Sequence, residues 1–131
     1  MDIAVRYYSR SGNTRAAAEA IAKAAGTEAV SADAPDAALP GTVDILFVGG
    51  ALYAYGIDRK LTEYLRSLKK EEVRKAVIFS TSWVSKHAIE LIRKELEAKG
   101  IPVEDRTFYF RGKPGEKQLR EAETFAKQFL A

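Results

Sequence analysis

Six residues near the N-terminus combine the side chains and the backbone freedom that a phosphate site needs. They are Ser9, Arg10, Ser11, Gly12, Asn13 and Thr14. An apolar run at residues 3–8 precedes them, and an alanine-rich stretch suited to a helix follows directly. The free N–H groups of a helix N-terminus attract an anion, hydroxyl and amide groups add donors, and glycine allows close approach. Because helix capping alone needs only one such residue, the pattern predicts a phosphate-binding loop between a strand and a helix.

Two later segments place aromatic residues among small ones. The first is Gly49-Gly50-Ala51-Leu52-Tyr53-Ala54-Tyr55-Gly56, and the second is Ser80-Thr81-Ser82-Trp83, which holds the single tryptophan of the chain. Aromatic residues in two loops beside a phosphate site predict that a planar ring system is clamped by stacking. Two structural alternatives stay open: one of the two tyrosines folds back onto the core, and Trp83 is a partly buried residue at the start of the next helix.

Apolar runs and helical periods alternate along all 131 residues. The pattern predicts strands at 2–8, 27–30, 43–49, 75–80 and 103–110, and helices at 13–25, 58–68, 85–99 and 116–130. Such alternation favours a single α/β domain over residues 1–131, with a three-layer, doubly wound, five-stranded parallel sheet in the order 2-1-3-4-5. In that order the loops after the first, third and fourth strands meet at the carboxyl edge of the sheet.

Composition excludes several classes of function. There are no cysteines and one histidine, so thiol chemistry and thiolate metal sites are excluded, and neither a metal site nor a catalytic residue set is expected. His87 is expected to be a surface residue at the start of a helix. The net charge is +3, but the basic residues alternate with glutamates along the predicted helices, which is typical of a solvated face and not of a nucleic-acid binder. No apolar stretch is long enough to insert into a membrane.

Residues 7–14 resemble the FMN-phosphate loop of the flavodoxins, whose pattern is Ser/Thr-x-Ser/Thr-Gly-x-Thr after the first strand. The resemblance extends through the two aromatic loops, covers nearly the whole chain and is that of a short-chain member. It implies that the first segment holds the FMN phosphate and that the other two embrace the isoalloxazine ring. The implied cofactor-binding residues are Ser9, Arg10, Ser11, Gly12, Asn13 and Thr14, then Ala51, Leu52, Tyr53, Ala54, Tyr55 and Gly56, and then Thr81, Ser82 and Trp83.

The resemblance also implies an activity. We expect a monomeric cytoplasmic electron carrier that shuttles low-potential electrons through FMN, from a donor reductase to an acceptor oxidoreductase. An electron carrier is favoured over a substrate-specific oxidoreductase.

This chain departs from the flavodoxin pattern in its charge. Flavodoxins are commonly acidic around the flavin, whereas this chain is net basic and has Arg10 inside the phosphate loop. Arg10 either points at the phosphate, where it would strengthen FMN binding, or points outward as a surface charge. A more positive environment predicts a less negative potential for the second electron than in acidic flavodoxins.

Two other functions are compatible with the same residues. The segment at 49–58 is similar to the corresponding loop of the flavodoxin-like, menaquinone-dependent protoporphyrinogen oxidases, which implies an FMN oxidoreductase acting on a quinone or porphyrinogen. The short chain, without an obvious insertion for a substrate pocket, argues against that function. A third interpretation is a module that has lost FMN and acts through protein contacts. The hydroxyl groups retained at 9–14 argue against it.

Overall fold

A computed structural model describes residues 1–83 and 85–130 of the chain. Its centre is a five-stranded sheet, in which every adjacent pair of strands is parallel and the order is β2-β1-β3-β4-β5. The predicted architecture and strand order are therefore confirmed. The strands are β1 (Ile3–Tyr7), β2 (Ala29–Ser31), β3 (Ile45–Gly50), β4 (Ala76–Thr81) and β5 (Phe108–Phe110). The helices are α1 (Asn13–Ala25), α2 (Arg59–Ser67), α3 (His87–Ala98) and α4 (Glu116–Lys127), with a short 3-10 helix, η1, at Lys70–Glu72.

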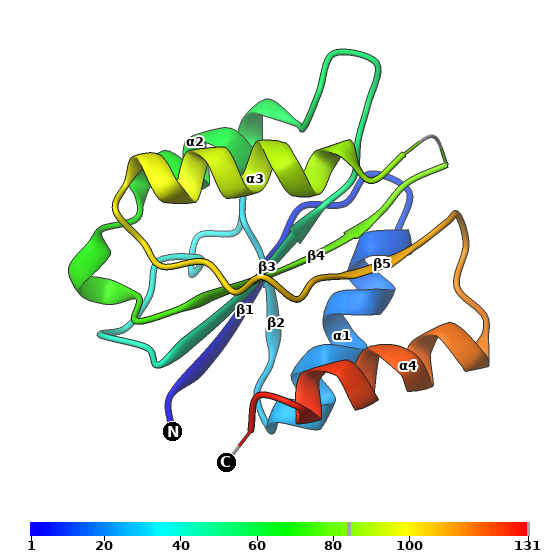
Figure 1. Ribbon diagram of the computed structural model, residues 1–131, viewed down its shortest axis with the longest axis horizontal. Coiled ribbons are helices and arrows are strands. Elements are labelled where there is room, and N and C mark those ends of the chain that lie inside the picture. Colours follow the sequence, from blue (N-terminus) through cyan, green and yellow to red (C-terminus); the bar gives the residue numbers. More distant parts are fainter. Residues whose placement is uncertain (84, 131) are drawn as a thin grey trace.

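Helices cover both faces of the sheet (Figure 1). One face is covered by α1 and α4, and the other by α2 and α3. Successive residues of β3 alternate between the two resulting cores: Leu46 and Val48 pack towards α2 and α3, while Ile45 and Phe47 pack towards α1 and α4. This double coverage explains why β3 reads as a continuous apolar run, since a strand buried on both faces has no solvent side.

Helical spacing of apolar residues places each helix on the sheet. The predicted face of α2 is buried through Leu61, Tyr64 and Leu65. Helix α1 packs with small residues, mostly alanines, and ends at Gly26, whose φ of 72° is the left-handed conformation that closes many helices. The predicted helix bounds agree with the structure within three residues at each end.

The last strand differs from the prediction of a continuous strand over 103–110. Val103 forms an isolated parallel bridge with Ala76, and β5 begins only at Phe108. Between them the carboxylate of Glu104 accepts hydrogen bonds from Arg106 and from Lys75, the latter at 3.3 Å. Side-chain bonds to nearby backbone compete with a strand ladder, which explains why the charged part of this segment leaves the sheet.

The cations around Glu104 also affect its acidity. Hydrogen bonds from the side chain and backbone of Arg106 lower the pKa of the Glu104 carboxyl to about 2. This carboxylate therefore stays charged as the pH falls towards 2, and it holds the 103–107 segment to Lys75, the residue before β4.

None of the helices in the described part of the chain is long and apolar enough to cross a membrane.

Two glycines at the end of β3 leave room for the side chains beside them. A Cβ atom on Gly49 would lie 2.3 Å from the ring of Phe79, and one on Gly50 would lie 2.4 Å from Cδ2 of Leu61. Both neighbours are fully buried, so they have little freedom to move away. The glycines thus allow β3 to end between two tightly packed cores.

We expect Gly49→Ala to lower the free energy of unfolding by about 1–3 kcal/mol, because the added methyl group overpacks the core at Phe79. Urea denaturation measures this loss. Gly41→Ala is the matched control, since a Cβ atom there meets nothing within 4 Å. Equal losses in the two variants would contradict the packing argument.

Candidate cofactor site

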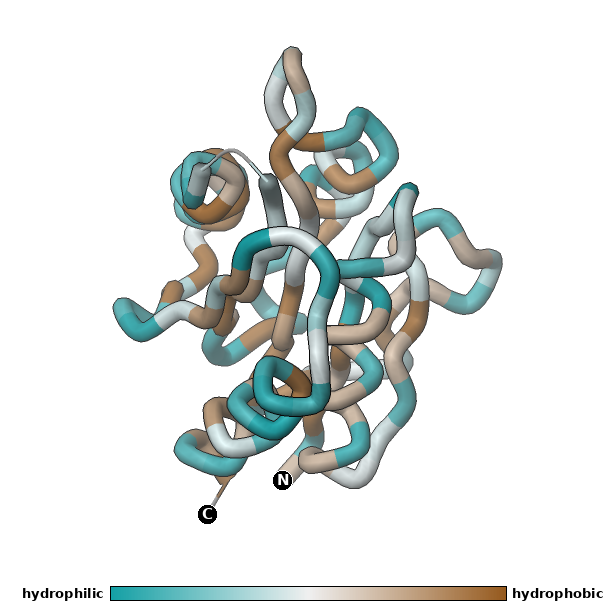
Figure 2. Tube along the Cα trace, turned by 90° about the vertical axis from the view of Figure 1, so that its right-hand side faces the viewer, coloured by the Kyte–Doolittle hydropathy of each residue, from teal (hydrophilic) through white to brown (hydrophobic). Residues whose placement is uncertain are grey.

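The three predicted loops lie at one edge of the sheet. Because β1, β3 and β4 are parallel, the segments that leave their carboxyl ends emerge on the same side (Figure 1). The view in Figure 2 faces this edge directly. The β1–α1, β3–α2, β4–α3 and β5–α4 connections, which lie on the right-hand side of Figure 1, therefore turn towards the viewer in Figure 2.

The β1–α1 loop is shaped as an anion cradle. Gly12 has a φ of 93°, precedes the first residue of α1 and donates its backbone N–H to Oγ of Ser9 at 3.0 Å. Ser11 and Gly12 are exposed, and the position of a Cβ on Gly12 is open space. Within the described residues, α1 has no side-chain cap and no acidic residue in its first turn. Its first N–H groups, at residues 13–15, therefore have no partner inside the helix and point at the loop.

The sequence predicts the Thr14 hydroxyl as a donor to the phosphate, but in the structure this hydroxyl has another partner. The residue is 1% exposed, and its Oγ1 lies 2.7 Å from Oγ1 of Thr81, at the end of β4. This buried hydrogen bond joins the start of α1 to the loop after β4. The Thr14 hydroxyl thus connects two of the predicted loops, and its backbone N–H belongs to the first turn of α1.

The Arg10 side chain, which is 45% exposed, contacts the β3–α2 loop. Its Nε donates to Oδ2 of Asp58 at 3.0 Å, and its Cζ lies 3.9 Å from the centre of the Tyr53 ring. Its Nη2 also donates to the hydroxyl of Tyr55. A single side chain of the phosphate loop therefore reaches across the edge and holds the β3–α2 loop by an ion pair and a cation–π contact.

Asp58 has two roles at this point. It is the N-cap of α2 and accepts the backbone N–H of Lys60 at 2.8 Å, while its other carboxylate oxygen binds Arg10. Its side chain is 10% exposed, against 45% for Arg10. An N-cap aspartate is visible in the sequence before the predicted helix, but its pairing with Arg10 joins residues 48 positions apart and has no local signal.

The β3–α2 loop is a tight turn whose two tyrosines differ in exposure. Tyr53 and Gly56 exchange backbone hydrogen bonds of 2.7 and 3.0 Å, and Gly56 adopts a φ of 118°. Ala54 and Tyr55 form the exposed tip, with Tyr55 66% exposed. Tyr53 is half-buried, and this burial raises the pKa of its phenol.

The rest of this loop supports the turn. Leu52 is partly buried and packs against the α2–α3 core, and Ala51 is half-buried at the end of β3. The loop thus presents one half-buried and one exposed tyrosine, which are stacked with their ring centres 6.3 Å apart.

Trp83 lies over a fourth loop that the sequence interpretation missed. Its side chain is 66% exposed, and a Cβ on Gly112 would lie 2.4 Å from its indole ring. Gly112 has a φ of 71° and donates its N–H to the carbonyl of Ser82 at 3.3 Å. Ser82 is itself buried, and the Tyr109 hydroxyl donates to the same carbonyl at 2.8 Å. The β5–α4 loop therefore supports the indole from below.

His87 is exposed at the first residue of α3, which confirms the expectation of a surface histidine. Within the described residues, no group of three or more His, Asp or Glu side chains is arranged to hold a metal ion.

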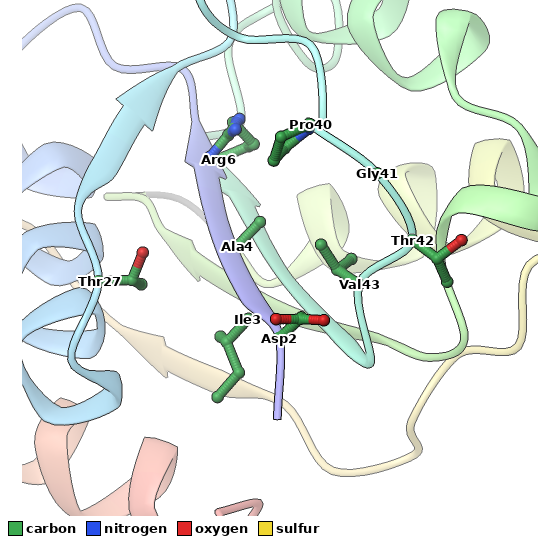
Figure 3. Close-up of a pocket in the computed structure, with 9 residues that line it drawn as sticks. All are labelled: Asp2, Ile3, Ala4, Arg6, Thr27, Pro40, Gly41, Thr42 and Val43. Atoms are coloured by element: carbon green, nitrogen blue, oxygen red, sulfur yellow. The ribbon is translucent and has the colours of Figure 1, made fainter.

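A separate cavity of about 360 Å³ lies at the amino half of β1, away from the four loops (Figure 3). The sticks in Figure 3 show Arg6 at one end of this cavity, near Pro40. The Arg6 guanidinium is already engaged, since its Nε donates to the carbonyl of Ala37 at 2.7 Å and its Nη1 to that of Val5 at 3.1 Å. None of the predicted cofactor-binding residues lines this cavity.

Comparisons with known proteins agree with this arrangement. The family model described as "Flavodoxin domain" matches residues 4–131. No curated protein matches the chain. Among solved structures, a flavodoxin from the domain Archaea is 24% identical, with a TM-score of 0.75 over 98% of this chain and 95% of that one. Oxidised flavodoxin 1 from Bacillus cereus is 18% identical, with a TM-score of 0.80 and coverages of 99% and 97%. The Flv1 flavodiiron core from Synechocystis is 21% identical, with a TM-score of 0.75; the match covers 98% of this chain and 35% of that core.

We expect Thr14→Val to lower the free energy of unfolding by about 1–3 kcal/mol, because it leaves the Thr81 hydroxyl buried without its partner. The double variant Thr14→Val/Thr81→Val should lose less than the sum of the two single variants, since neither hydroxyl is then left unpaired. Urea denaturation of all three variants measures the coupling. Thr124→Val, at an exposed position of α4, is the control, and strictly additive losses at 14 and 81 would disprove the proposed pairing.

Proposed function

The chain belongs to the flavodoxin family, and from this premise we propose that it binds FMN at the carboxyl edge of its sheet and carries electrons between redox proteins. FMN is the cofactor of this family. When bound, FMN supplies reversible electron transfer, while the protein supplies binding, orientation and local charge. The single observation that carries the proposal is the uncapped N-terminus of α1 behind Gly12, which opens between two loops with exposed aromatic residues.

The phosphate of FMN fits the β1–α1 loop. A phosphate dianion needs several donors and a positive potential, and the free N–H groups of residues 13–15 and the α1 dipole supply both. The hydroxyl of Ser11 and the amide of Asn13 add donors at the same loop. Ser9 and Thr14 act mainly as supports, because their hydroxyls already bond to Gly12 and Thr81.

The ring of FMN fits the space between the aromatic loops. Tyr53 and Tyr55 lie on one loop and Trp83 on the other, so a planar ring between these loops has aromatic partners from both sides of the edge. Gly56 and Gly112 keep the backbone near these residues free of side chains. Arg10 would lie beside the ring, because its guanidinium already rests on Tyr53.

A second candidate function is an FMN oxidoreductase that acts on a quinone or porphyrinogen. It is favoured by one observation, a groove of about 410 Å³ between α2 and α3 that reaches Tyr55 and Gly56. Photoreduction distinguishes the two candidates. A carrier takes up its two electrons in separate one-electron steps, whereas an enzyme of this kind turns over a menaquinone analogue or a porphyrinogen in two-electron steps.

We expect the purified protein to quench the fluorescence of added FMN and Ser11→Ala to bind FMN about tenfold more weakly, through loss of one charge-assisted hydrogen bond to the phosphate. Fluorescence titration measures both affinities. The matched control is Ser67→Ala, since Ser67 lies at the opposite edge of the sheet and its hydroxyl donates to the carbonyl of Tyr64. A protein that leaves FMN fluorescence unchanged would rule out both flavin functions.

We expect the second electron to be taken up at a less negative potential than in flavodoxins with an acidic flavin environment, because nearby cations favour the added negative charge. Arg10→Gln should make this potential more negative. Potentiometric titration of the FMN-loaded protein measures the shift, with Arg74→Gln as the control because Arg74 is also ion-paired, with Asp44, but lies at the opposite edge of the sheet. A potential for the second electron that is unaffected by Arg10→Gln would contradict a direct effect of its charge.

A further inference from the structure

Exposed cations lie beside Trp83 at the same edge as the candidate cofactor site. Arg111 and Lys113 are exposed on either side of Gly112, the residue on which the indole rests. Lys86 is exposed at the start of α3, and its Nζ lies 5.7 Å from the centre of the Tyr109 ring, whose hydroxyl binds the carbonyl of Ser82. We call these four residues, Trp83, Lys86, Arg111 and Lys113, the Trp83 patch.

The cations of the Trp83 patch differ from the other cations of this edge in their lack of acidic partners. Four other cations at the edge are paired: Arg10 with Asp58, Arg15 with Glu19, Arg59 with Glu63 and Lys60 with Asp33. Among the described residues, no carboxylate lies within ion-pair distance of Lys86, Arg111 or Lys113, although α3 and α4 carry Glu90 and Glu116 in their first turns. Three positive charges without an acidic partner therefore lie near one exposed indole.

From this arrangement we propose that the Trp83 patch docks a redox protein through a carboxylate-rich face of that partner. Tryptophan and arginine are the residues that most often dominate binding energy at protein interfaces, and unpaired surface cations steer an acidic partner towards them. The inference rests on the proposed function, because it places the partner next to the loops that would hold the flavin. Close approach is what electron exchange between two proteins requires.

The patch fits a protein better than it fits a nucleic acid. Binders of single strands present several aromatic platforms along a basic groove. In the described chain the only strongly exposed aromatic residues are Tyr55 and Trp83, and Tyr55 is bound to Arg10 on the opposite loop. A compact patch of three cations around one indole suits a brief, electrostatically steered encounter between proteins.

The first experiment measures binding without relying on FMN. Because Trp83 is the only tryptophan, its fluorescence reports on the patch directly when the protein is titrated with an acidic, tryptophan-free [2Fe–2S] ferredoxin as a probe. We expect saturable quenching at low ionic strength that weakens as salt is added. Arg111→Glu/Lys113→Glu should weaken binding about tenfold or more, whereas Lys69→Glu/Lys70→Glu, an equal charge change at exposed residues of the opposite edge, should change it by less than about twofold.

The second experiment uses the FMN-loaded protein. Stopped-flow mixing with the reduced ferredoxin transfers an electron from the iron–sulfur cluster to the flavin, and bleaching of the flavin gives the rate. We expect this rate to fall as ionic strength rises, and to be about tenfold lower in Arg111→Glu/Lys113→Glu. The FMN affinity of this variant should be unchanged. Basic cytochrome c, used as the oxidant of the reduced protein, is the opposite case. Its rate of reduction should rise with ionic strength and in Arg111→Glu/Lys113→Glu, because the cations of the Trp83 patch repel it.

The outcomes separate this inference from the proposed function. Failure to bind FMN overturns the proposed function, while the Trp83 titration still tests the patch. Normal FMN binding with equal losses in the two charge-reversal variants overturns the docking surface. Saturable binding of a single-stranded DNA oligonucleotide at physiological salt, without binding of ferredoxin, also overturns it and would assign the patch to nucleic acid instead.

Discussion

The parallel pairing of β1 with both β2 and β3 is the constraint on which the site depends. After β2 the chain crosses to the other side of β1, so the loops that follow β1 and β3 diverge from neighbouring strands and leave space between them. The register between β1 and β3 aligns the starts of the two loops. Tyr7 lies opposite Gly49, and the N–H of Tyr8 donates to the carbonyl of Gly49 at 3.2 Å. A shift of one residue would exchange the two faces of β1 and move the phosphate loop away from its partners.

Within this frame the loops hold one another in place through a few side chains. The Thr14 side chain joins the first loop to the end of β4, and the Arg10 side chain joins it to Asp58. A backbone hydrogen bond from the Gly112 N–H to the Ser82 carbonyl joins the β5–α4 and β4–α3 loops. These side chains are already committed, so the groups left for a ligand are mainly backbone N–H groups and the exposed residues of the loop tips. Such preorganisation lowers the entropy that a ligand must overcome when it binds.

The charged side chains at the carboxyl edge of the sheet would affect both the cofactor and the docking of a partner. Most cations there are neutralised by adjacent carboxylates, whereas those around Trp83 are not. The paired cations position loops, and Arg10, which rests on Tyr53, also places a positive charge beside the loop that would hold the flavin. The unpaired cations contribute a field that would act on an approaching protein. One distribution of charge thus bears on the potential of the carrier and on the choice of its partner.

The sequence by itself determined the features that arise from local patterns, namely the alternation of strands and helices and the glycine-containing loop before α1. The alternation in turn favoured the doubly wound strand order, which is the usual arrangement for such a chain. These features rest on spacing and on the conformational freedom of residues within a few positions of one another, so they can be predicted without coordinates. Tertiary structure alone decided where Arg10 points, what the Thr14 hydroxyl binds and that Gly112 lies under Trp83. These contacts join residues far apart in the chain, 48 positions for Arg10 and Asp58 and 67 for Thr14 and Thr81, and they exist only once the parallel strands bring their loops to one edge.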